Sequence, residues 1–453
     1  MPNLRCKLLI IGAGPGGYVC AIRAGQLGLE TIIVDEAAPG GTCLNVGCIP
    51  SKALIHAADE FHRITKMKDG PLGIRAAAPE IDLGKTVAWK DGIVERLNTG
   101  VAGLLKKAGV RFTPGHARFL DGKTVRVTPS EGQDYEVHAE HIVVATGSAP
   151  AELPSLPFGG DVMSSTEALS LDAVPRSLAV VGGGYIGLEL GTAFAKLGSK
   201  VTIVEAESRI LPTYDAALTR PVAERLDRLG VTVLADTRAQ THAEGVLSTD
   251  KGGVEAQKVL VTVGRRPRTK GIGIEELSLT MDGPFIRIDG SCQTSMRGIH
   301  AIGDVTGDPM LAHRAMAQGE MVAEHIAGHA VDWDKRCIPA VCFTDPEIVS
   351  CGAAPGDIEG TKHSEFPFSA NGRAMTCDAE AGFMRVVWRE RDEAIVGLQA
   401  VGTHISELSA AFSLAIEMGA CLEDIAATIH AHPTQAEALQ EACLRARGRA
   451  LHI

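Results

Sequence analysis

The sequence lacks any uninterrupted apolar run of about 18 residues, so it predicts no membrane-spanning helix. It also lacks clusters of Lys and Arg. The net charge of −11 is spread along the chain, which disfavours nucleic acid or an anionic membrane surface as a partner. Near the start, the apolar run at residues 8–11 is too short for a signal peptide and is followed by glycines. We therefore expect a cytoplasmic protein.

The sequence also lacks cysteines and histidines at the spacing of metal ligands. The chain has eleven cysteines, an odd number in a protein large enough to be stable without disulfides. Most stand alone in apolar patterns and are expected to be small buried hydrophobes. None is paired with Cys or His at the tight spacing of a zinc site, so no metal is predicted. Only Cys43 and Cys48 share a short glycine-rich loop.

The 453 residues are enough for about three domains, and many of the 51 glycines gather in motifs. The first motif, GAGPGG at residues 12–17, lies between an expected strand (7–11) and an expected helix (18–27). A second strand (31–34) then ends at Asp35. This order is the full context of a dinucleotide site. Gly12, Gly14 and Gly17 allow the tight turn and the close approach of a pyrophosphate, and Asp35 accepts hydrogen bonds from ribose hydroxyls.

The whole arrangement recurs 170 residues later. The second copy has strands at 177–181 and 200–204, glycines at Gly182, Gly184 and Gly187, and an acid at Glu205. Two turns that look alike by chance would not repeat with strands, helix and acid in register, so we expect two bound dinucleotides. Glu205 should repel a 2′-phosphate and favour NAD over NADP. Arg209 lies close by and opposes that preference.

Three further strand ends are candidates for cofactor contacts. Strands expected at 142–145 and 259–263 end in glycine-containing loops and are predicted to close over a dinucleotide. A third, at 298–302, runs into Gly303 and Asp304, an acid placed to bind ribityl hydroxyls, although a turn Asp is the alternative. Three prolines at 149–157 indicate a linker between the two nucleotide units. After about residue 336, strand-like runs (382–388 and 394–401) and helix-like runs (407–418 and 436–447) alternate in an α+β pattern.

The loop at residues 40–52 reads GGTCLNVGCIPSK and carries Cys43 and Cys48. Two residues five apart on a regular helix differ by about 7.5 Å in axial rise, whereas a disulfide tolerates Cα separations up to roughly 6.8 Å. A bridge between Cys43 and Cys48 therefore needs a distorted segment, for which Gly47 supplies freedom. Strained disulfides are the reducible ones. A pair of unlinked structural thiols remains the alternative on spacing alone.

A candidate acid–base pair lies near the other end of the chain. Pro433 suits the first turn of a helix expected at residues 436–447. Glu437 can return toward His432, raise its basicity and hold one tautomer. A histidine before a helix is more often a cap or surface residue, and we expect His430 to pack or orient.

The run GGTCLNVGCIPSK resembles the redox-active segment of the pyridine nucleotide–disulfide oxidoreductases, and the resemblance extends over nearly the whole chain. It is most similar to the members that oxidise dihydrolipoyl groups in 2-oxoacid dehydrogenase complexes. The phrases that carry this similarity are AIGDV (301–305), MLAH (310–313) and FPFSAN (366–371). The implied fold is α/β, with two Rossmann-like dinucleotide-binding domains and a C-terminal α+β dimerisation domain. The implied boundaries are 1–148 and 269–335 for FAD, 149–268 for NAD, and 336–453 for dimerisation.

The resemblance also implies residue roles. Cys43 would exchange with substrate, and Cys48 would face the flavin. Lys52 would pair with Glu189 beside the flavin ring. The protein would be a homodimer, in which His432 with Glu437 would serve the disulfide of the partner subunit. FAD would be bound by Gly12, Gly14, Gly17, Asp35, Gly41, Thr42, Lys52, Ala117, Thr146, Gly147, Ser148, Asp304 and Ala312. NAD would be bound by Gly182, Gly184, Gly187, Glu205, Val233 and Gly264, with Tyr185 as the gate of the nicotinamide pocket.

Departures from the family pattern are few. Asp35 replaces the usual Glu, Arg268 stands where Asn is common, residues 351–364 form a shorter segment, and Gln435 and Ala436 vary. Glutathione-type reductases would carry basic residues in place of Glu205, mercuric reductases a C-terminal cysteine pair, and transhydrogenases no cysteine pair in the loop. A non-catalytic flavoprotein scaffold would not need all four reactive groups.

The implied partners are lipoyl domains and an acyltransferase core. Residues 88–92 and 344–346 favour a branched-chain 2-oxoacid complex over pyruvate, 2-oxoglutarate or glycine-cleavage systems.

Overall fold

The first sheet forms around the strand predicted at residues 7–11. The computed structural model describes residues 3–70 and 72–453, and in it this strand is β1 (Asn3–Ile11). It pairs in parallel with β2 (Thr31–Asp35) and β5 (Tyr135–Val144). β3 (Arg111–Phe119) lies beside β2 and β18 (Ile299–Ala301) beside β5, which gives the parallel order β3-β2-β1-β5-β18. Continuous apolar runs such as 8–11 are typical of parallel strands that are buried on both faces.

The two faces of β1 are covered by different elements. Leu8 and Ile10 pack with apolar residues of α1 (Pro15–Gln26), α4 (Leu83–Lys107) and α8 (Ala312–Ile326). Leu9 and Ile11 pack against an antiparallel extension, in which β4 (Thr124–Pro129) pairs with the second half of β3 and the first half of β5. The sequence predicted only the end of β5, at residues 142–145. The antiparallel extension was not predicted.

The second sheet repeats the first. Its order is β10-β9-β8-β14-β7 and all its pairings are parallel. The predicted strands at 177–181 and 200–204 are confirmed as β8 and β9, and α6 follows the glycine loop as α1 does in the first unit. The elements of this unit are β7 (Val162–Met163), α5 (Ser165–Ala168), β8 (Ser177–Val181), α6 (Tyr185–Lys196), β9 (Lys200–Val204), α7 (Ala216–Arg228), β10 (Thr232–Leu234), an antiparallel β11 (Ala239–Ala243), β12 (Val246–Thr249) and β13 (Gly252–Glu255), and β14 (Lys258–Val261).

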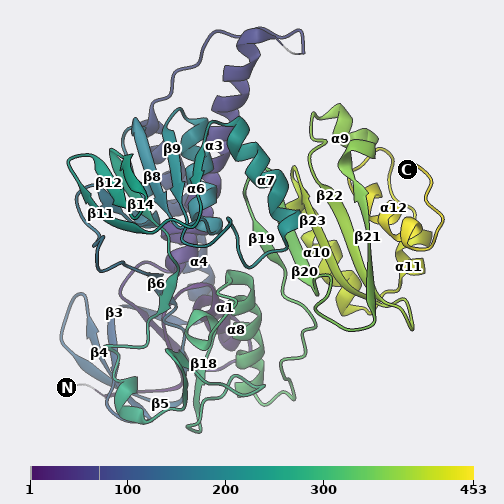
Figure 1. Cartoon of the computed structure of the whole chain (residues 1–453). Helices are drawn as coiled ribbons and strands as arrows, with labels where there is room; N and C mark the ends of the chain where they lie inside the picture. Colours follow the sequence, from purple (N-terminus) through teal and green to yellow (C-terminus); the bar gives the residue numbers. More distant parts are fainter. Residues whose placement is uncertain (1–2, 71) are drawn as a thin grey trace.

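The chain crosses between the two units twice, and the crossings pair with each other. β6 (Ser148–Pro150) is antiparallel to β15 (Arg265–Pro267). After the second crossing, β16 (Met281–Asp282) and β17 (Phe285–Ile286) form a small hairpin, and β18 and α8 return to the first unit. Figure 1 shows β6 between the two sheets and α8 beside α1. The proline-rich linker predicted at residues 149–157 therefore begins as one strand of a two-stranded connection.

The C-terminal region is an antiparallel sheet with helices packed on one face, on the right in Figure 1. Val349, Met384 and Ala400 point to that face and pack with the helices. Their neighbours Ile348 and Val401 point to the other face and join the core of the second nucleotide unit. The elements are β19 (Ala340–Cys342), β20 (Glu347–Gly352), β21 (Thr361–Pro367), α9 (Gly372–Thr376), β22 (Phe383–Arg389), β23 (Ile395–Gly402), α10 (Ser409–Glu417), α11 (Leu422–Ala427) and α12 (Glu437–Ala446).

The prediction for Pro433 was wrong. α12 begins at Glu437, so Pro433 lies in the preceding turn and not in the first turn of the helix. The carboxylate of Glu437 accepts the backbone N–H of Thr434 at 2.7 Å, which closes this turn ahead of the helix. Within residues 3–70 and 72–453, no helix combines the length and apolar character needed to cross a bilayer. The same residues contain no group of three or more His, Cys, Asp or Glu arranged to hold a metal ion.

Candidate functional site

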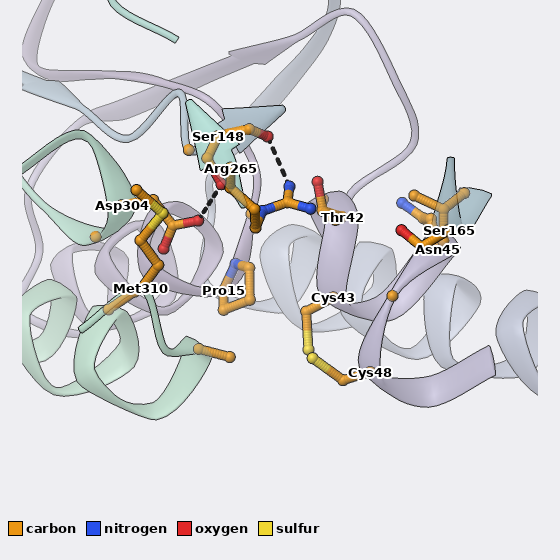
Figure 2. Close-up of a pocket in the computed structure, with 18 of the residues that line it drawn as sticks. Pro15, Thr42, Cys43, Asn45, Cys48, Ser148, Ser165, Arg265, Asp304 and Met310 are labelled. Atoms are coloured by element: carbon orange, nitrogen blue, oxygen red, sulfur yellow. Dashed lines mark hydrogen bonds between the residues drawn. The ribbon is translucent and has the colours of Figure 1, made fainter. Parts of the chain in front are cut away.

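The two cysteines of the predicted redox loop lie on either side of a break between helices. α2 (Gly41–Val46) carries Cys43, and α3 (Cys48–Lys66) begins at Cys48. Gly47 separates them, and a Cβ atom there would lie 2.8 Å from the carbonyl oxygen of Thr42. The expected distortion is therefore a complete interruption of the helix. Both cysteines are free thiols, and their sulfur atoms point toward each other (Figure 2).

The pKa values of the two thiols are shifted in opposite directions. The Cys43 thiol donates a hydrogen bond to Cys48, which raises the pKa of Cys43 well above its ordinary value, and burial raises it further. The same hydrogen bond lowers the pKa of Cys48 to about 7; burial and Glu189 oppose this effect, whereas the nearby Lys52 ammonium supports it. The negative charge of the reduced pair therefore resides on Cys48, the residue with the more stabilised thiolate.

Lys52 lies one helical turn after Cys48 on α3, on the same side of the helix. Its Nζ is 2.7 Å from Oε2 of Glu189, which is only 4% exposed and comes from α6 of the second unit. The other oxygen of Glu189, Oε1, accepts the backbone N–H of Phe343 at 3.0 Å. The predicted Lys52–Glu189 pair is thus present and bridges the two nucleotide units next to the thiols.

Two adjoining pockets are lined by most of the residues predicted to bind FAD. Asp35 and Thr146 line both pockets, as do Arg265 and Arg268. Ala117 and Gly12 line the second pocket, at the end away from the thiols. The predicted residues that line the first pocket are Gly14, Asp35, Gly41, Thr42, Cys43, Cys48, Lys52, Thr146, Gly147, Ser148, Tyr185, Glu189, Asp304 and Ala312.

An extended dinucleotide fits this pair of pockets. The first unit presents the start of α1 to the pocket, and its N-cap Gly14 has no side chain to satisfy the first N–H groups of the helix. Such free N–H groups bind a pyrophosphate. Gly41 lies opposite, and a Cβ on it would come within 2.5 Å of the Gly14 Cα. The residues present therefore suit a flavin dinucleotide.

The repeat extends to individual hydrogen bonds. Asp35 accepts the N–H groups of Ala13 (2.6 Å) and Ala37 (2.9 Å). At the positions 170 residues later, Glu205 accepts the N–H groups of Gly183 (2.5 Å) and Glu207 (2.7 Å). Each acid is thereby held at the mouth of its glycine loop, where a ribose is expected.

The first and last glycines of each motif are sterically required. Gly12 and Gly182 have φ of +103° and +106°, the left-handed region that favours glycine. Gly17 and Gly187 permit close helix–strand packing, because a Cβ on them would lie 1.9 Å from Gly12 O and 2.3 Å from Gly182 O. The glycine loop of the second unit therefore has a backbone that suits a second bound dinucleotide. Of the residues predicted for NAD, Tyr185 lines the first pocket, whereas Gly182, Gly184, Gly187, Glu205, Val233 and Gly264 line neither pocket.

Arg209 is not free to bind a 2′-phosphate. Its guanidinium donates to the carbonyl oxygens of Leu211 (3.1 Å), Pro212 (2.7 Å) and Tyr214 (2.6 Å). The basic residue that opposed the predicted preference for NAD is therefore part of the loop structure. Glu205 remains as the charged group at the ribose position, which fits NAD.

One polar network in the first pocket was not predicted from the sequence. Arg265, from the second crossing strand, donates to Ser148 Oγ (2.7 Å) and Ser148 O (2.9 Å), and Ser148 Oγ donates to Asp304 (Figure 2). The network ties both crossing strands to the acid predicted for the ribityl chain. The sequence contained Arg265 in a strand-end loop, but it gave no information on the direction of its side chain.

The predicted acid–base pair is formed, at a distance from the thiols of its own chain. His432 Nδ1 is 2.9 Å from Glu437 Oε1, and His432 is 81% exposed. Burial opposes ionisation of Glu437, but the Thr434 N–H and His432 lower its pKa overall. An ionised carboxylate only accepts, so Nδ1 carries the proton and Nε2 is free as a base. Neither residue lines the two pockets, and α12 packs on the outer helical face of the C-terminal sheet (Figure 1). His430 Nδ1 contacts the carbonyl of Thr428 at 2.9 Å, as an orienting contact.

Several known proteins are similar to this chain over nearly its whole length. A dihydrolipoyl dehydrogenase of Pseudomonas aeruginosa is 56% identical over 99% of both chains. The dihydrolipoyl dehydrogenase of Geobacillus stearothermophilus is 43% identical over 99% of this chain and 98% of its own. Among solved structures, LpdA of Mycobacterium tuberculosis has a TM-score of 0.90 at 27% identity, covering 98% of this chain and 99% of the other.

Two family models cover the chain. Residues 6–319 match the pyridine nucleotide-disulphide oxidoreductase model, and residues 338–443 match the dimerisation domain of the same family. Members of the family use FAD and NAD, and the dimerisation domain accounts for a homodimer. The predicted fold class, cofactors and dimer are thereby confirmed. The chain belongs to the pyridine nucleotide-disulphide oxidoreductase family.

Proposed function

We propose that this protein is a dihydrolipoyl dehydrogenase, which reoxidises protein-bound dihydrolipoyl groups with NAD through Cys43 and Cys48. The observation that carries the proposal is the position of the thiols. They open onto a pocket that also contains Lys52 and Glu189 and the start of α6. A dithiol is thus placed between two nucleotide units whose acids suit FAD and NAD.

The residues of the chain divide the exchange reaction as follows. Nε2 of His432, from the partner subunit, takes the proton of one substrate thiol. The resulting thiolate attacks Sγ of Cys43 in the Cys43–Cys48 disulfide, and Cys48 leaves as a thiolate. A low pKa makes Cys48 a good leaving group. The second substrate thiol then attacks the mixed disulfide, which releases oxidised lipoyl and the Cys43 thiol.

When bound, FAD would supply an acceptor for the electron pair of the dithiol, and NAD would supply the final hydride acceptor, which would restore the disulfide. The chain supplies orientation and charge around this chemistry. We assign the first-pocket and second-pocket residues to FAD, with Asp35 and Asp304 on its hydroxyls. The second glycine loop and Glu205 are assigned to NAD, and Tyr185, whose pKa is raised to about 12 by burial, to the gate between them.

The partners we propose are a second copy of the chain, lipoyl domains and the acyltransferase core of a 2-oxoacid dehydrogenase complex. Service to a branched-chain 2-oxoacid complex, drawn from residues 88–92 and 344–346, stays part of this proposal. We also propose a cytoplasmic location, supported by the nine cysteines outside the Cys43–Cys48 pair, all of which are free thiols and suit a reducing compartment.

Steady-state kinetics with dihydrolipoamide test this proposal. We expect turnover with NAD, little turnover with NADP, and loss of activity by several orders of magnitude in Cys48→Ser. Cys377→Ser, an exposed thiol outside both pockets, is the matched control and should retain full activity. Unchanged activity in Cys48→Ser, or a preference for glutathione disulfide with NADPH, would overturn the proposal.

A further inference from the structure

A loop of the C-terminal region touches the ion pair beside the thiols. Phe343, which follows β19, places its ring 4.3 Å from Nζ of Lys52, measured to the ring centroid. Its backbone N–H donates to Glu189 Oε1 at 3.0 Å, while Glu189 Oε2 is 2.7 Å from the same Nζ. One residue thus contacts both members of the pair, the cation through the aromatic face and the anion through the backbone.

The loop is anchored on either side of these contacts. Asp345 Oδ2 is 2.8 Å from Lys196 Nζ on α6 and 2.8 Å from Arg225 Nε on α7. Burial opposes ionisation of Asp345, but the two cations outweigh it and lower its pKa. Thr344 Oγ1 donates to Pro346 O at 2.7 Å inside the loop. Phe343 is therefore held in place by contacts that do not involve the thiols or Lys52.

Lys52 needs such a restraint. It has a flexible four-carbon side chain and is 32% exposed, whereas its partner Glu189 is 4% exposed and fixed. A cation over an aromatic face is attracted to it, most strongly where water is excluded. Glu189 by itself raises the pKa of Cys48, and a hydrogen bond to its carboxylate satisfies part of that charge. Both contacts of Phe343 thus favour the Cys48 thiolate.

We infer that Phe343 is a positioning residue, by which the dimerisation domain holds the Lys52–Glu189 pair beside Cys48 and so controls the reactivity of its thiolate. The inference rests on the proposed function, in which Cys48 is the leaving thiolate. It assigns a task in the reaction to a residue outside the two nucleotide units and outside both pockets.

The test compares Phe343→Leu and Phe343→Met, which lose the ring and keep the backbone N–H, with Phe343→Tyr, which keeps the ring. The matched control is Phe383→Leu, because Phe383 packs its ring 5.0 Å from the Arg385 guanidinium in the same domain. The first measurement is the pH dependence of Cys48 alkylation by iodoacetamide, read by peptide mass spectrometry on the flavin-loaded dimer in a Cys43→Ser background. The second is the pH profile of kcat/KM for lipoamide in the reverse reaction with NADH, in enzyme that retains Cys43, because the enzyme form that meets lipoamide carries the reduced thiol pair.

We expect the Leu and Met variants to shift the Cys48 titration upward by about half a pH unit, as for the loss of a weak cation–π contact. The acid limb of the kcat/KM profile should move in the same direction, and Tyr should restore both. Phe383→Leu should lower the thermal midpoint without moving either curve. If the ring-less variants only lose stability, with both curves unmoved, Phe343 is structural and the inference fails. Failure of the proposed function would appear separately, as absence of dihydrolipoamide oxidation in the unmodified enzyme.

Discussion

At the level of single residues, the role of a charged or aromatic side chain depends on the groups that it contacts in the folded chain. Asp35 and Glu205 were found as strand-end acids, and the structure places both on the N–H groups of their own glycine loops. Arg209 could not be judged from sequence, because its neighbour in space depends on a turn that presents three carbonyl oxygens. Phe343 was missed for a similar reason. Nothing in its local pattern indicates that its ring faces Lys52 from another domain.

His300 shows how a buried residue without a clear sequence signal affects stability. The side chain of this β18 residue is 1% exposed, and neither ring nitrogen has a hydrogen-bond partner. His141 on β5 and His325 on α8 lie 5.9 and 5.8 Å away between ring centroids, and Asp289 is the nearby acid. Burial, then the two histidines, lower the pKa of His300 to about 4, with Asp289 opposing.

This lowered pKa predicts a loss of stability in acid. Between pH values of about 6.5 and 4, the unfolded chain binds a proton at residue 300 that the folded chain does not bind. The free energy of unfolding therefore decreases as the pH decreases. The effect is absent above pH 6.5 and reaches about 3 kcal/mol near pH 4. Thermal midpoints of His300→Leu and the unmodified protein, measured from pH 7.5 to 4.5, should diverge in favour of the variant as the pH falls. Replacement of the exposed His363 by Leu is the control, and parallel curves for His300→Leu would contradict the prediction.

At the level of elements, the regular parts were predictable and the irregular parts were not. Strands β8 and β9 have the predicted bounds because their apolar runs stop at glycine or charged residues. The helix predicted at residues 407–418 begins instead with a 3₁₀ turn, Ile405–Leu408, before α10. The pairing of β6 with β15 joins segments more than 110 residues apart. No local sequence pattern indicates a contact between segments so far apart. Likewise, no local pattern indicated that Pro433 lies before the helix.

The interruption between α2 and α3 leads to a prediction on Gly47. A methyl group at this position would meet Thr42 O at 2.8 Å and Cys43 Cα at 3.2 Å, so α2 would move relative to α3. Because thiol exchange requires aligned sulfurs, we expect Gly47→Ala to lower kcat by roughly tenfold or more, since displacements of about 1 Å can cost 10²-fold. The cofactors should stay bound. Gly100→Ala, in an exposed part of α4 with open space around it, should be fully active and slightly more stable. A fully active Gly47→Ala enzyme would show that the interruption is not needed.

At the level of the whole molecule, local patterns identify all four reactive groups, whereas their assignment to two subunits came only from the family resemblance. Within one chain, Cys43 and Cys48 line a pocket whose walls come from both nucleotide units, whereas the exposed His432 lies beyond the C-terminal sheet. The dimerisation domain of the family supplies the missing step, because twofold symmetry can bring the His432–Glu437 pair of one subunit to the thiols of the other. The active site we propose is thus completed only in the dimer.

Mixed dimers test this arrangement directly. Cys48→Ser and His432→Gln should each be nearly inactive as homodimers. In a mixed dimer, the intact thiols of the His432→Gln subunit would meet the intact histidine of the Cys48→Ser subunit, and one site in two would work. Co-expression with separate affinity tags, giving random assembly, should therefore restore about a quarter of the unmodified activity per dimer, and purified mixed dimers about half. If His432 served the thiols of its own chain, the mixed dimer would contain no intact site and activity would stay at the level of the two homodimers. Purification through both tags separates this outcome from failure to assemble, so the level of recovered dihydrolipoamide oxidation decides which subunit supplies the base.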